Sequence, residues 1–179
     1  MMLTTYATPD TFRCVPLEQL APIINELVSI EWPCPEDNIQ GIIERLGWTF
    51  LSKASRVQAD THLPVSWPLG DFAKVNGFLE ELFFDVSTRL SNEDAVSTVV
   101  VSEAYLGMIE GLASILGESS GEESDENGHA TWWDLPTGGR LLLDRPPEAI
   151  TIRVMSQRYA DADRFRETHD MSIYHDDED

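Results

Sequence analysis

Hydrophobic residues follow a helical period in three segments of the chain. The first predicted helix begins at Pro16 and ends before Trp32, the second begins near Pro35 and ends at Gly47, and the third follows Ser91 and ends at Gly117. Gly47 and Gly117 are expected to end the second and third helices, because glycine readily adopts the left-handed conformation found just past a helix end. Ser91 is the expected N-cap of the third helix, with Asp94 in the place of the usual glutamate of a capping box.

Elsewhere apolar and polar residues alternate, which is typical of strands with one buried face. The alternation is clearest around Leu82, Phe84 and Val86. The predicted strands lie near residues 48–52, 72–76, 78–88, 132–135, 141–143 and 150–154. A short helix is expected over residues 160–168.

The order of these elements is helix, helix, three strands, helix, two or three strands, helix. Strands joined by hairpins, with the helices apart from them, predict an α+β fold. We expect an antiparallel sheet of about five to six strands with helices packed on one face. The expected organisation is a flexible lead-in over residues 1–12, a single domain over 13–168 with an acidic loop at 118–129, and an acidic tail over 169–179.

The charge balance narrows the possible partners. The 179 residues include 32 Asp and Glu against 12 Lys and Arg, which gives a formal net charge of −20. Nucleic acids and anionic membranes repel such a surface, so neither is an expected partner. A basic protein partner is favoured, since opposite charges accelerate association. The alternative is that the acidity only keeps the protein soluble. Without a basic stretch leading into an apolar run near Met1, and without 18 consecutive apolar residues, we expect a cytoplasmic protein.

The sequence contains no recognisable catalytic or metal-binding motif. The four histidines are scattered, with no HExxH or CxxC spacing, and no phosphate-binding loop or serine nucleophile elbow is present. Cys14 and Cys34 are the only cysteines, so no disulfide framework exists. We therefore expect a protein that is not an enzyme and that uses no cofactor and no metal.

Two groups of residues are candidates for contact with a protein partner. Tryptophan near the end of an element can anchor an interface, although it more often packs in the core. Acidic runs can face a cationic cleft, although most are simply solvated. The candidate residues are Trp67, Trp133, Glu118, Glu122, Glu123, Asp125 and Glu126.

Several short motifs together resemble a known family. They are Glu31-Trp32 after the first helix, Gly47-Trp48 after the second, Ala113–Glu118 at the end of the third, and Gly138–Leu143 in a later strand. This combination resembles an uncharacterised actinobacterial domain-of-unknown-function family over about residues 12–158, whose members are similar to immunity proteins of polymorphic toxin systems. The resemblance implies no catalytic residues.

The leading hypothesis is therefore an immunity protein, or antitoxin, that neutralises a basic toxin domain by stoichiometric binding. The element order is also similar to that of type III secretion chaperones, so a chaperone holding an effector segment is the alternative. A small enzyme of unknown class is the third. The sequence leaves open which toxin activity is blocked and whether the protein is a monomer or a homodimer.

Overall fold

One large antiparallel sheet organises the protein. The computed structural model describes residues 6–53, 56–91, 94–126 and 128–162. Within them, nine strands form the sheet: β2 (Cys34–Pro35), β3 (Thr49–Lys53), β4 (Arg56–Asp60), β5 (Leu69–Val75), β6 (Phe78–Asp85), β8 (Gly121–Asp125), β9 (Gly128–Asp134), β10 (Gly139–Arg145) and β11 (Thr151–Ser156).

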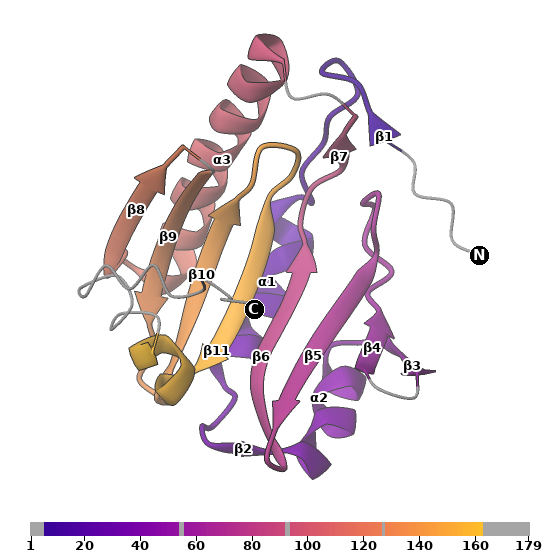
Figure 1. Ribbon diagram of the computed structural model, residues 1–179, viewed down its shortest axis with the longest axis vertical. Coiled ribbons are helices and arrows are strands. Elements are labelled where there is room, and N and C mark those ends of the chain that lie inside the picture. Colours follow the sequence, from indigo (N-terminus) through magenta and orange to yellow (C-terminus); the bar gives the residue numbers. More distant parts are fainter. Residues whose placement is uncertain (1–5, 54–55, 92–93, 127, 163–179) are drawn as a thin grey trace, which may run out of the picture.

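The sheet consists of two antiparallel meanders that meet at its centre. The strand order is β3-β4-β5-β6-β11-β10-β9-β8, with the short β2 also paired to β6. The first meander runs inward from β3 to β6, and the second runs inward from β8 to β11 (Figure 1). Helix α3 (Ala95–Leu116) carries the chain from the first meander to the far edge, where β8 begins.

Three helices cover one face of the sheet. Helices α1 (Leu17–Val28), α2 (Ile39–Arg45) and α3 all lie behind the strands in Figure 1, and a 3₁₀ turn, η1 (Glu36–Asn38), leads into α2. Alternate strand residues point to this face, so the core forms where they meet the apolar helix stripes. Its fully buried members include Leu20, Ile24, Leu27, Ile43, Leu82, Phe84, Leu112, Leu141, Leu143, Ile152 and Val154.

The opposite face of the sheet carries a smaller apolar cluster and several ion pairs. Leu142, Met155 and Ala160 pack together there, and Ala160 belongs to a helical segment over residues 157–162. Arg140 is buried on this face, where its Nε donates to Asp134 Oδ1 at 3.2 Å and its guanidinium lies 4.8 Å from the centroid of the Trp132 ring. Paired charges and a few apolar contacts therefore complete this side.

The α+β class, the antiparallel sheet and the packing of helices on it are confirmed. The sheet has nine strands in the described chain rather than five or six, because short or polar strands such as β4 and β8 carry little apolar alternation. The expected C-terminal helix begins earlier, at residue 157, and the segment 157–162 contacts the face opposite α1–α3. The rest of that helix and the tail 169–179 lie outside the described residues.

Three local expectations need correction. Residues 6–12 are not a loose lead-in, because β1 (Tyr6–Ala7) pairs in parallel with β7 (Arg89–Leu90) and Phe12 is buried; residues 1–5 lie outside the described chain. The acidic segment 118–129 is not a loop throughout, since Gly121–Asp125 form β8. The N-cap of α3 is Asp94 rather than Ser91, because Asp94 Oδ1 accepts a hydrogen bond from Ser97 N at 2.8 Å.

Candidate functional site

The outer side of α3 is apolar and exposed. This helix is long and apolar enough to cross a membrane by length and composition alone. Its inner side packs in the core through Val101 and Leu112, whereas Val96, Val99 and Leu106 are between 55% and 62% exposed. A helix that is apolar all round is normally buried on all sides. The exposed side of α3 is therefore a candidate binding surface.

The exposed residues of α3 form a single stripe. Val96, Val99, Glu103, Leu106 and Glu110 are spaced by three or four residues, which places them along one side of the helix, and all five are exposed. This α3 stripe thus combines three apolar and two acidic side chains. Such a surface fits a partner that offers both apolar groups and basic side chains.

Strand β8 is an acidic edge of the sheet next to α3. It pairs only with β9 among the described strands, so its other side has no strand neighbour there. Glu122, Glu123, Asp125 and Glu126 are exposed along β8 and the turn that follows it. Gly121 lies opposite Trp132, and a Cβ at this position would come within 2.4 Å of the indole ring, so glycine is needed for this pairing.

A groove of about 470 Å³ separates α3 from the ends of β8, β9 and β10. Leu106 and Ile109 form its helical wall, while Glu122, His129 and Arg145 line it from the strands. We call this cavity the α3–β8 groove. It joins the α3 stripe to the acidic edge through the shared residues Leu106 and Glu122.

Tyr105 lies at the base of the α3–β8 groove. Its hydroxyl is 2.6 Å from Thr131 Oγ1 and donates to the carbonyl oxygen of Leu143 at 3.3 Å. Burial raises the pKa of this hydroxyl, which therefore stays protonated at neutral pH. The His129 ring lies beside the tyrosine ring, with 6.0 Å between the centroids. Tyr105 therefore contributes a protonated hydroxyl, held by hydrogen bonds, to the lining of the groove.

Arg145 is the unusual residue of the groove. It is only 8% exposed, and its Nε is buried with no hydrogen-bond partner in the described chain. Arg145 lies on the same face of β10 as Leu141 and Leu143, and this face is directed toward α3. A charged residue at an inward-facing position of an apolar strand was the sequence signal that could have identified this groove.

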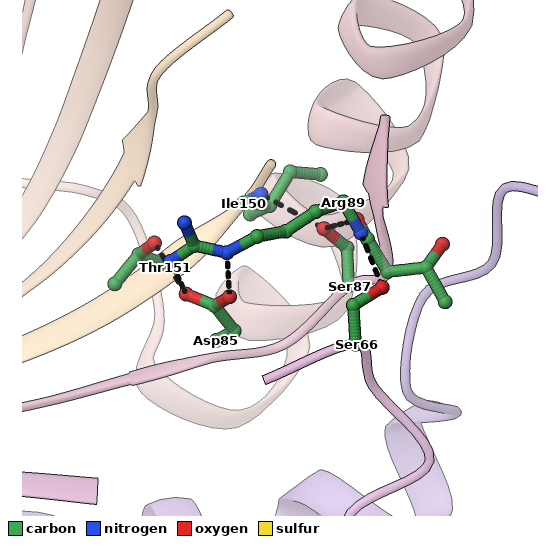
Figure 2. Close-up of polar contacts among 7 residues, drawn as sticks. Ser66, Asp85, Ser87, Arg89, Ile150 and Thr151 are labelled. Carbon is green, nitrogen blue, oxygen red and sulfur yellow. Dashed lines mark hydrogen bonds and ion pairs between the residues drawn. The ribbon is translucent and has the colours of Figure 1, made fainter. Parts of the chain in front are cut away.

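A second polar cluster stands at the corner where β6 meets β11 (Figure 2). Arg89 donates to Asp85 at 2.7 Å, and Thr151 Oγ1 donates to the same carboxylate at 3.2 Å. Burial raises the pKa of Asp85, and the hydrogen bond from Arg89 opposes this effect. Ser87 Oγ accepts from Ile150 N at 2.9 Å. Because these groups satisfy one another, the cluster is a structural corner.

The sequence-predicted contact residues fall into three places. Glu122 and Glu123 line the α3–β8 groove, with Glu118, Asp125 and Glu126 exposed nearby in the same segment of chain. The two tryptophans do not join them. Trp133 is 2% exposed and its Nε1 donates to the carbonyl of Gly117 at 3.0 Å, so it offers a partner no surface. Trp67 is half-buried between β4 and β5, near the other end of the sheet.

The described residues contain no cluster of three or more His, Cys, Asp or Glu side chains that could hold a metal ion. A family model described as a family of unknown function (DUF6301) matches residues 18–156. The chain belongs to this family. Comparisons of this DUF6301 chain with curated proteins and with solved structures give no match.

Proposed function

We propose that this DUF6301 protein is a cytoplasmic, non-enzymatic immunity protein that neutralises a basic toxin domain by binding it stoichiometrically. The binding surface would consist of the α3 stripe and the acidic edge of β8. The observation that supports this proposal most directly is the exposure of Val96, Val99 and Leu106 beside an acidic edge strand.

The two halves of this surface have different physical roles. Apolar residues such as Leu106 supply contact area that is removed from water on binding. The carboxylates of Glu122 and Glu123 attract basic side chains and raise the rate of encounter, which the net charge of −20 increases further. Among the described strands β8 has a neighbour on one side only, so its edge also offers a place for a strand of the partner.

Two alternative roles of this surface compete with the proposal. Acidic side chains on an edge strand can serve only to prevent unwanted strand pairing. In the chaperone alternative, two copies of the chain would bury the α3 stripe against each other and hold an extended effector segment. Both alternatives differ from the proposal in the stoichiometry and the salt dependence of binding.

The first test is to co-purify the tagged protein with the product of the adjacent gene and to identify the bound chain. A one-to-one complex with a folded basic domain is expected. Its association rate constant should fall at least about tenfold between about 50 and about 500 mM salt, because shorter Debye lengths screen steering. A homodimer that captures only extended segments would favour the chaperone, and a salt-independent association rate would contradict the electrostatic part.

A pair of charge-matched variants locates the surface. The double change E122Q/E123Q removes two negative charges from the β8 edge, and D37N/E44Q removes two from exposed positions in η1 and α2. The first pair should weaken the complex at least about tenfold and the second about twofold or less, because contact charges matter more than distant ones. Equal effects would mean that net charge alone drives binding and that β8 is not the contact surface.

A further inference from the structure

Arg145 is largely buried, and one nitrogen of its guanidinium, Nε, has no hydrogen-bond partner in the described chain. Arginine stays charged at any pH at which proteins fold. Arg145 is 8% exposed, its Nε has no partner, and none of the ion pairs in the described chain includes it. A buried polar group that lacks a hydrogen bond lowers the stability of the protein.

Other buried or half-buried arginines in the described chain do have acidic partners. Arg89 pairs with Asp85, Arg140 with Asp134, and Arg153 with Glu81. Arg145 is different because it lines the α3–β8 groove without forming an ion pair with any described carboxylate, although Glu122 and Glu123 line the same groove. A buried polar group without a partner calls for an explanation, and a bound ion or ligand is one such explanation.

The walls of the groove restrict the kind of anion. Its volume of about 470 Å³ lies within the usual range of small-molecule sites, and Leu106, Ile109 and Ala130 give it an apolar lining. Glu122 and Glu123 lie at the same groove and repel anions, a doubly charged phosphate more strongly than a singly charged carboxylate. An anion with a single charge and an apolar body is the best match.

We propose that the α3–β8 groove binds a small amphipathic monocarboxylate. The carboxylate accepts hydrogen bonds from the guanidinium of Arg145, and the apolar body lies against Leu106 and Ile109. An Arg–carboxylate pair is among the strongest polar contacts available to proteins, because its hydrogen bonds are charge-assisted. This inference does not depend on the immunity function, since the ligand is a small molecule rather than a protein.

Three six-carbon probes test the proposal: hexanoate, 1-hexanol and hexylamine, which differ only in the head group. Binding to the full chain is followed by amide chemical-shift changes at neutral pH. Hexanoate should bind saturably, at least about tenfold more tightly than 1-hexanol, with shifts centred on Tyr105 and His129. Equal affinities for hexanoate and 1-hexanol, no saturable binding of hexanoate, or tighter binding of hexylamine would overturn the proposal.

Two variants assign the preference to one side chain. R145Q should abolish the preference for hexanoate over 1-hexanol, whereas R158Q, at an exposed arginine outside the groove, should keep it. Retention of the full preference in R145Q would overturn the role of Arg145. If R145Q does not fold, the comparison of probes on the unaltered protein still decides, as does inorganic phosphate, which must bind more weakly than hexanoate.

Discussion

The hydrogen bond between Tyr105 and Thr131 is the best place to test how the floor of the groove is held together. Both residues are buried, at 4% and 2% exposure, and their hydroxyl oxygens are 2.6 Å apart. Y105F leaves the threonine hydroxyl unsatisfied inside the protein, which destabilises the fold by about 1–3 kcal/mol. T131V should have a smaller effect, about 1 kcal/mol, because the tyrosine still donates to Leu143 O at 3.3 Å.

The decisive quantity is the coupling free energy between the two changes, which the double variant measures. Replacing both partners by apolar groups of similar shape is nearly neutral for the hydrogen bond itself, so Y105F/T131V should be less destabilised than the sum of the single changes by about 1 kcal/mol. Urea unfolding at pH 7 measures each free energy of unfolding, with an unchanged m-value as a check of two-state behaviour. Y6F, at an exposed tyrosine, is the control and should change stability by less than about 0.5 kcal/mol. A coupling below about 0.3 kcal/mol would refute the hydrogen bond.

Two further predictions concern polar groups outside this pair. S87A should destabilise the protein by about 1–3 kcal/mol in urea unfolding, because Ile150 N loses its hydrogen-bond acceptor at 2.9 Å inside the core. The control S114A, at an exposed serine, should have almost no effect. Equal effects of the two changes would refute this role of Ser87. Burial raises the pKa of Asp144 above its ordinary 3.8. Between the unfolded and the folded pKa the carboxyl of the folded protein is protonated while that of the unfolded chain is ionised. The free energy of unfolding therefore decreases as pH rises above about 4. The free energy of unfolding of the unaltered protein, minus that of D144N, should therefore fall between about pH 4 and pH 7, and a flat or rising difference would contradict the raised pKa.

Helices and central strands were predictable because burial imposes a period on the sequence. The apolar stripe from Leu17 to Val28 predicted a helix between Pro16 and Trp32, and α1 spans Leu17–Val28. The alternation around Leu82 and Phe84 gave β6, and alternation also required Trp132 and Trp133 to face opposite sides of the sheet. Trp133 is in the core, while Trp132 lies beneath the guanidinium of Arg140.

Strand β8 could not be predicted from its own residues. The run Gly121–Asp125 has no apolar side chain and matches the composition of a loop. It forms a strand because β9 offers it a backbone edge and because Gly121 leaves room for the Trp132 ring. Similarly, Tyr6–Ala7 pair only because the fold brings Arg89–Leu90 beside them.

The sequence by itself determined the fold class, the three helices and the acidity of the surface. It could do so because each of these depends on residues close together in the chain. The tertiary structure alone decided which side of α3 is left uncovered and which acidic residues adjoin it. It alone brought Arg145 to the same groove as Tyr105, Leu106 and Glu122. These relations join segments far apart in sequence, whose contact depends on how two meanders and a long helix pack rather than on any local pattern.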